Sequence, residues 1–154
     1  MGELITTLEV FRKDYIEMPQ LPTREEKDGS WISSQLMRAG FVGGEVKRLH
    51  LDSKYWVCTK KDFQDWIEWD WTNGKKYIAE EYDCDNFALS FKARCDRKIG
   101  INAVGLVIDY SGGHAYNLVV FSDVAPELFE PQNDSWKKKG QSKIFTLTNG
   151  YVIL

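Results

Sequence analysis

The apolar residues between positions 83 and 95 repeat with the period of a helix. They stand at i, i+3, i+4, i+7 and i+11: Cys84, Phe87, Ala88, Phe91 and Cys95. This spacing predicts a helix that buries one face. Asp83 comes directly before the apolar face and is a candidate N-cap. We therefore expect a helix over 83–97 that begins with Cys84 in its first turn.

The same period predicts three helices earlier in the chain. Residues 3–18 carry a narrow apolar seam, and 30–39 form a second amphipathic stretch with Ser30 as candidate N-cap. A third helix is predicted after Thr59, which makes a capping pair with Asp62, and it should end at the turn of residues 73–74. The first two helices could pack on their own domain or bind a partner, and we expect them to pack on their own domain.

Beyond residue 100 the pattern favours strands. Short apolar runs at 104–108, 114–121 and 127–130 are separated by turn residues, which predicts an antiparallel meander. Two more strands are predicted at 45–51 and 55–58. Asn149-Gly150 separates two final apolar runs and is a strong signal for a hairpin over 144–154.

Helices followed by a sheet predict an α+β fold, in which the helix of Cys84 packs on an antiparallel sheet. The 154 residues are enough for one domain with a substantial core. We expect the α+β domain to span residues 45–154. Residues 1–44 are expected to form an N-terminal helical arm that belongs to the same domain or binds a partner.

Charge and composition exclude several classes of partner. The net charge of −3 and the pI of about 5.4 give no basic surface for nucleic acid, apart from the short run Lys137-Lys138-Lys139. Neither an 18-residue apolar span nor a secretory leader is visible, so we expect no membrane segment and a cytoplasmic location. The three cysteines match neither a disulfide framework nor a metal knuckle and are expected to be reduced thiols.

Cys84 has the position of a nucleophile. Unpaired backbone N–H groups and the helix dipole favour a thiolate in a first helical turn. His114 follows two glycines at the start of a predicted strand. Because antiparallel strands bring the start of one beside the end of the next, His114 should lie near Glu130, with Asn133 or Asp134 as alternative partners. Cysteine, histidine and a carboxylate could then act together as nucleophile, base and orienting group.

The carboxylates beside Cys84 argue against the hypothesis that Cys84 is a nucleophile. Asp83 and Asp85 would raise the pKa of the thiol, so something must offset their charge. His114 could do so as an imidazolium, the two carboxylates could serve as caps, or they could bind a divalent cation.

Other polar and aromatic side chains could support a site. Asn117, Gln132 or the backbone N–H of Cys84 could stabilise an oxyanion, and Asn133 could support the histidine. Four tryptophans could stack on a carbohydrate: Trp56, Trp66, Trp69 and Trp71. Their spacing is more typical of a core, and we expect burial.

Four blocks of residues resemble a known family when taken in their order and spacing. They are Tyr82-Asp83-Cys84-Asp85-Asn86-Phe87-Ala88, Ile101-Asn102-Ala103-Val104-Gly105, Gly113-His114-Ala115-Tyr116-Asn117 and Phe129-Glu130-Pro131-Gln132-Asn133-Asp134. Over residues 45–135 they resemble the papain-like domain of the lectin MOA-related family, which includes the C-terminal protease domain of Marasmius oreades agglutinin and small bacterial and phage proteins.

This resemblance implies a papain-like fold with the family's cysteine, histidine and glutamate at Cys84, His114 and Glu130. It also implies a cysteine protease, a hydrolase with a catalytic triad, that acts on a peptide or protein substrate. The calcium dependence of the fungal relative would place metal ligands at Asp85 and Gln132. The sugar-binding β-trefoil half of that relative has no counterpart here, and neither do the first 44 residues.

Two functions follow as hypotheses. The first is a papain-like thiol enzyme of the protease or amidase type that attacks a carbonyl with Cys84 and could use Ca²⁺ as cofactor. The second is a non-catalytic binding protein with the same fold, such as a phage-encoded factor that binds a host protein. A fold does not fix a function, so both stay open.

Overall fold

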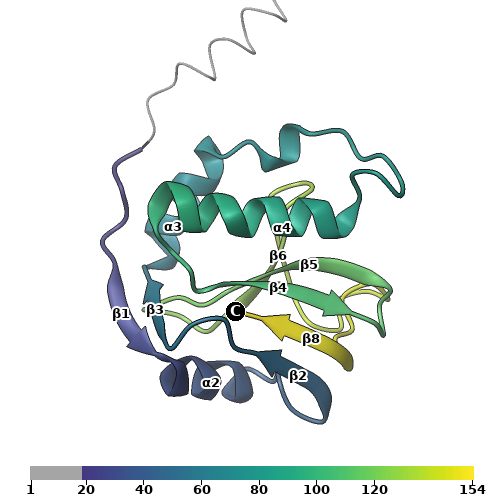
Figure 1. Cartoon of the computed structure of the whole chain (residues 1–154), viewed down its shortest axis with the longest axis horizontal. Coiled ribbons are helices and arrows are strands. Elements are labelled where there is room, and N and C mark those ends of the chain that lie inside the picture. Colours follow the sequence, from purple (N-terminus) through teal and green to yellow (C-terminus); the bar gives the residue numbers. More distant parts are fainter. Residues whose placement is uncertain (1–18) are drawn as a thin grey trace, which may run out of the picture.

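A computed structural model describes residues 19–154 (Figure 1). The helix expected over 3–18 lies outside the described residues. The helices are α2 (Gly29–Arg38), α3 (Lys60–Trp69), the 3-10 turn η1 (Thr72–Gly74), α4 (Cys84–Arg94) and the π-helical turn η2 (Cys95–Ile99). The strands are β1 (Glu25–Asp28), β2 (Glu45–Leu49), β3 (Lys54–Val57), β4 (Val104–Asp109), β5 (His114–Val119), β6 (Glu127–Glu130), β7 (Ser135–Lys137) and β8 (Asn149–Ile153).

Six of the strands form one mixed sheet in the order β2-β8-β4-β5-β6-β7. All neighbours are antiparallel except β2 and β8, which run parallel. The expected meander is therefore confirmed as β4, β5 and β6. β1 and β3 pair separately as a two-stranded antiparallel ribbon.

Helices cover both faces of the sheet, with α3 and α4 on one face and α2 on the opposite side (Figure 1). The side chains of β5 alternate between the two cores. Tyr116 and Leu118 pack in the cluster that includes α2, whereas Val119 packs with the residues of α3 and α4. Because both faces are covered, β5 is an almost continuous buried run rather than an alternating one. The α+β class predicted from the sequence is confirmed.

α4 begins at Cys84 because its N-terminus is capped on both sides. The Asp83 side chain accepts from the backbone of the third helical residue, and the Asn86 side chain accepts from the backbone N–H of Asp83 at 3.1 Å. α4 continues into η2, and η2 ends at Gly100, whose φ of 63° favours a residue without a Cβ. The predicted cap and the predicted start of this helix are confirmed.

The other caps agree in part with the sequence prediction. Thr59 caps α3 as expected, since its hydroxyl accepts from the backbone N–H of Asp62 at 3.2 Å. The expected cap of α2 is wrong: Asp28, and not Ser30, accepts from the backbone N–H of Trp31 at 2.7 Å. A carboxylate accepts a backbone hydrogen bond more strongly than a hydroxyl, and the N-cap therefore lies two residues earlier than predicted.

The hairpin expected over 144–154 is also wrong. β8 is a strand of its own that pairs with β4 and β2, and Asn149-Gly150 lies at its start instead of in a turn. The reason is a close approach between strands. A Cβ on Gly150 would lie 2.0 Å from the carbonyl oxygen of Ile108, so the glycine is needed for pairing and not for a reversal of the chain.

The described part of the N-terminal arm packs on the sheet. Ile32 and Leu36 of α2 are fully buried in one core with Val107 and Val152 of the sheet. The domain boundary expected at residue 44 stays a prediction. Within residues 19–154, no helix has the length and apolar character that a membrane crossing requires.

Candidate functional site

A groove of about 420 Å³ opens where the N-terminus of α4 meets one end of the sheet. Cys84 comes from the first turn of α4, His114 from the start of β5 and Glu130 from the end of β6. The groove is lined by these three residues and by Tyr77, Gly113, Gln132, Asn133, Lys137, Ile144 and Phe145. The three residues expected to form a site therefore share one groove.

His114 and Glu130 form the floor of this groove. The Nε2 atom of His114 lies 2.6 Å from Oε2 of Glu130, and both side chains are at most 10% exposed. The other Glu130 oxygen accepts from the backbone N–H of Gln132 at 3.1 Å. Because Nε2 is bound to the carboxylate, Nδ1 is the nitrogen left for other partners. Within residues 19–154, no hydrogen bond joins the Cys84 thiol to His114.

A buried carboxylate holds the turn before His114. Asp109 accepts from the hydroxyl of Ser111, the backbone N–H of Gly112, the hydroxyl of Tyr116 and the backbone N–H of Leu147, at 2.6–2.9 Å. Burial alone would raise the pKa of Asp109, but these hydrogen bonds outweigh it and lower the pKa. Asp109 thus ties the β4–β5 turn to the segment that carries Phe145 into the groove.

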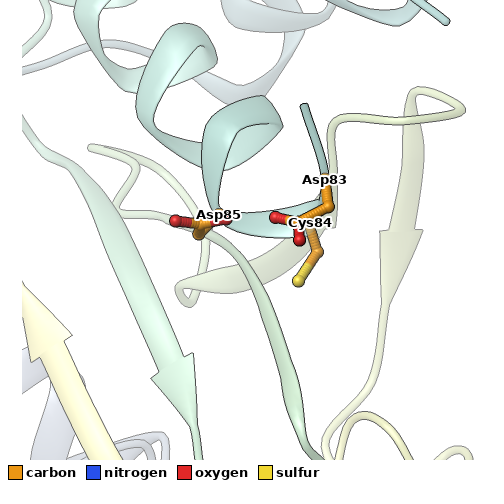
Figure 2. Close-up of side chains that lie close together, drawn as sticks. All are labelled: Asp83, Cys84 and Asp85. Carbon is orange, nitrogen blue, oxygen red and sulfur yellow. The ribbon is translucent and has the colours of Figure 1, made fainter. Parts of the chain in front are cut away.

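The first turn of α4 gathers three possible ligand atoms. Oxygens of Asp83 and Asp85 and the Cys84 sulfur all lie within 4.8 Å of one another, and Figure 2 shows the three side chains side by side. A hydrogen bond with Asp85 lowers the pKa of Asp83, and the same contact raises the pKa of Asp85. Asp83 serves as the helix cap, which is one of the three ways foreseen for offsetting its charge.

The other two cysteines are core residues, as expected. Cys58 is 1% exposed and Cys95 is fully buried. Burial raises the pKa of Cys58 to about 12, and burial also raises that of Cys95 well above its ordinary value. Cys84 alone among the three cysteines is partly exposed.

Asn117 does not line the groove. Its side chain is fully buried between α4 and the sheet, where the amide donates to the carbonyl oxygens of Ala88 and Gly105 at 2.9 and 3.1 Å. It therefore fixes α4 on the sheet and is remote from the position expected for an oxyanion donor. Gln132 and Asn133 do line the groove, in the turn between β6 and β7.

Four residues of the groove wall were not among the site residues predicted from the sequence. Tyr77 lies in a polar loop and is 50% exposed, whereas Ile144 and Phe145 fall in the segment mistaken for a strand. Lys137 belongs to the basic run of residues 137–139 and lies on β7. Only Tyr77 carried a hint, because an aromatic side chain in a polar loop is often a contact residue.

The tryptophans are not a platform in this groove. Trp66 is 1% exposed, and it packs on Phe63 and Phe91 in the core under α3 and α4. Trp56 and Trp69 are half-buried against the same core. The expectation that these aromatics serve the core is confirmed for Trp66, Trp56 and Trp69.

The fold and the groove define an α+β domain with a polar site at one end of its sheet, and comparison gives its family. Residues 36–145 match the family described as "Ricin-type beta-trefoil lectin C-terminal domain", so the chain belongs to that family. No curated protein matches the chain.

Two solved structures share the fold. The structure titled "PSL1a-E64 complex" is 21% identical with a TM-score of 0.65, and the match covers 84% of this chain and 51% of that one. Polyporus squamosus lectin, bound to the "human-type influenza-binding epitope Neu5Aca2-6Galb1-4GlcNAc", is 20% identical with a TM-score of 0.62, covering 84% of this chain and 49% of that one. The chain thus spans about half the length of both proteins.

These findings correct the function that was predicted from the sequence. The relation to a lectin family is confirmed, but a papain-like protease domain is not shown. The expected cysteine protease, a hydrolase, is contradicted because the matching family is a lectin domain, and the comparisons give no evidence of a catalytic triad. A peptide substrate has no support among the comparisons, which agree better with the alternative of a binding protein.

Proposed function

We propose that this chain is a carbohydrate-binding domain whose ligand lies in the groove beside Cys84, His114 and Glu130. One observation carries the proposal: the groove joins an exposed aromatic ring to a set of hydrogen-bonding side chains from separate segments. Sugars present apolar C–H faces that pack on aromatic rings and hydroxyls that bond to amides and carboxylates.

The groove has the size and order of a ligand site. Its volume of about 420 Å³ falls in the range of small-molecule pockets. His114, Glu130 and the backbone of Gln132 already form one hydrogen-bonded chain, so the floor is organised before a ligand arrives. Tyr77 and Asn133 are exposed at the rim, where the Asn133 amide oxygen accepts from the Ser135 hydroxyl and its NH₂ group can contact a ligand.

The family supports a carbohydrate as the ligand class. The chain belongs to a lectin domain family, and one structural neighbour is titled as a lectin bound to a glycan. At 20% identity that neighbour supports the fold alone, so the proposal takes from it no particular sugar.

The test is binding of an oligosaccharide panel to the wild-type chain and to Tyr77→Ala, measured by glycan array and calorimetry. Loss of stacking should weaken binding by roughly fivefold, since an aromatic contact is worth about 1 kcal/mol. The control is Tyr110→Ala, which removes a ring that is 62% exposed and outside the groove. No binding by the wild type, or equal binding by both variants, rejects the proposal.

A second candidate function is thiol chemistry of the acyl-transfer type. The supporting observation is the 2.6 Å contact of His114 with Glu130, which leaves Nδ1 to take the thiol proton while Cys84 attacks a carbonyl. The same nitrogen would then return the proton to the leaving group as the acyl-thioester forms. Glu130 would orient the ring, and Gln132 or the backbone N–H of Cys84 would stabilise the oxyanion. The groove would then bind its ligand and react with it.

Alkylation by iodoacetamide tests this candidate with internal controls. Cys84 should react at pH 7.5, and His114→Ala should slow the reaction at least tenfold. Cys58 and Cys95 should stay unmodified, because both are buried and have raised pKa values. Labelling of Cys84 at the same rate in wild type and His114→Ala rejects thiol chemistry and leaves carbohydrate binding standing.

Calcium at Asp85 and Gln132 stays a proposal. The carboxylates of the first turn of α4 are hard oxygen ligands of the kind Ca²⁺ prefers. Bound calcium at 100 times its Kd would stabilise the fold by about 2.7 kcal/mol. A melting temperature that is the same in calcium and in chelator, for wild type and Asp85→Asn alike, rejects this proposal.

A further inference from the structure

A second groove lies on the other side of Lys137 from the first. It measures about 500 Å³ and is lined by Ala39, Phe41, Lys60, Pro126, Glu127, Lys137, Lys138 and Lys139. Four lysines and one glutamate thus line this groove, in a chain whose net charge is −3. Such a local reversal of charge attracts anions.

The single carboxylate of this groove is already paired. Lys60 Nζ lies 2.7 Å from Glu127 and stacks 5.0 Å from the ring centre of Trp136. Within residues 19–154, no carboxylate pairs with Lys137, Lys138 or Lys139. Their three charges are therefore available to a ligand.

Two of these lysines are held in place. Lys139 Nζ donates to the carbonyl oxygen of Gly40 at 2.6 Å, and Lys137 Nζ lies 5.6 Å from the ring centre of Phe145. Fixed amines lose less side-chain entropy when they bind an anion than freely moving ones. Lys138 is exposed between them.

Lys137 lines both grooves, and Phe145 beneath it lines the first. The two grooves are thus neighbours that share Lys137, so a chain-like ligand of sufficient length can contact both. We infer that the lysine groove binds acidic groups, carboxylate or sulfate, of an oligosaccharide whose neutral part occupies the first groove. This inference rests on the proposed function, and it names the class of ligand as an acidic glycan.

Binding should depend on salt and on the lysine charges. Exposed amines act through Coulomb attraction, which salt screens within about 10 Å at 0.1 M. A sulfated tetrasaccharide should therefore bind at least tenfold more tightly than the same tetrasaccharide without sulfate at 50 mM salt. The preference should shrink to less than threefold at 500 mM salt.

The decisive variant is Lys138→Gln with Lys139→Gln, measured by calorimetry against both tetrasaccharides. It should lose the preference for sulfate and keep its affinity for the neutral sugar. The control pair, Lys47→Gln with Lys98→Gln, removes two exposed charges outside the groove and should keep the preference.

The outcomes separate this inference from the proposed function. If wild type binds the neutral sugar and shows no preference for the sulfated one, the lysine groove is not an acidic-glycan subsite. If the control pair loses the preference as fully as the decisive variant, the effect is one of net charge and the inference is wrong. If hexaglutamate displaces the sulfated sugar at equal concentration, the groove binds acidic peptides instead. If neither sugar binds, the proposed function itself fails.

Discussion

The substitution Asp109→Asn tests whether one buried carboxylate holds the groove together. An amide keeps one acceptor oxygen and replaces the other by a donor. In the present fold Oδ1 accepts from Ser111 and Gly112, whereas Oδ2 accepts from Tyr116 and from the backbone N–H of Leu147. Whichever way the amide points, two hydrogen bonds to a charged oxygen are lost and a backbone N–H then faces an NH₂ group.

The expected cost follows from these contacts. Each hydrogen bond to a charged group contributes about 1.5–3 kcal/mol, so losing two should destabilise the fold by at least about 3 kcal/mol at pH 7. With an m-value of about 1.5 kcal/mol/M, the urea midpoint should fall by about 2 M. The Tyr116 hydroxyl stays protonated and donating, since burial and the neighbouring carboxylate raise its pKa.

The dependence on pH provides a second and independent measure. The folded pKa of Asp109 lies below its ordinary value of 3.8, so its contribution is complete above that value and is lost as pH falls through the folded pKa. The gap in stability between wild type and Asp109→Asn should therefore be constant from pH 7 to about 5 and should narrow below pH 4.

Urea unfolding at pH 7 and at several values down to pH 3, followed by tryptophan fluorescence, measures both effects. The control is Asp65→Asn, which removes one partner of an exposed pair with Lys61 and should leave the midpoint unchanged within error. A midpoint shift for Asp109→Asn as small as that of the control, or a gap that widens below pH 4, would refute the reasoning.

Three further substitutions test the packing around the site. Gly150→Ala would place a Cβ 2.0 Å from the Ile108 carbonyl oxygen and should prevent β8 from pairing with β4, which a thermal scan would show as a lower melting temperature. The control is Gly74→Ala, whose Cβ would meet its nearest atom at 3.7 Å and which should melt like wild type. Asn117→Ala leaves two buried carbonyl oxygens without their donor and should cost about 2 kcal/mol in urea unfolding; a loss under about 0.5 kcal/mol would show that the amide does not fix α4. Phe91→Ala removes the ring that stacks at 4.6 Å on Phe129 and should cost about 3–5 kcal/mol, with an unchanged urea midpoint as the contrary result.

Local sequence patterns were enough to predict α4 and the meander of β4, β5 and β6. The first turn of α4 is fixed by neighbours in sequence, since Asp83 and Asn86 cap each other's backbone, and such contacts can be read from spacing alone. The same holds for the approach of His114 to Glu130, because the antiparallel pairing of β5 with β6 leaves little choice of partner.

Contacts distant in sequence decided the rest of the site. Tyr77, Phe145 and Lys137 reach the groove only because segments far apart in the chain meet there, and no local period marks such meetings. Asn117 has the composition of a site residue, yet the helix laid over β5 makes it a buried clamp.

The final strand shows most clearly how contacts distant in sequence can outweigh a local preference. Asn149-Gly150 has the local chemistry of a turn, but the sheet needed a glycine where β8 passes close to Ile108, and strand pairing outweighed the turn preference. The sequence by itself determined the α+β class, the capped start of the Cys84 helix and the approach of His114 to residues 130–134, because each depends on neighbours or on a single strand pair. Only the tertiary structure decided the walls of the two grooves and the place of Lys137 between them, because these surfaces form where long-range packing brings separate segments together.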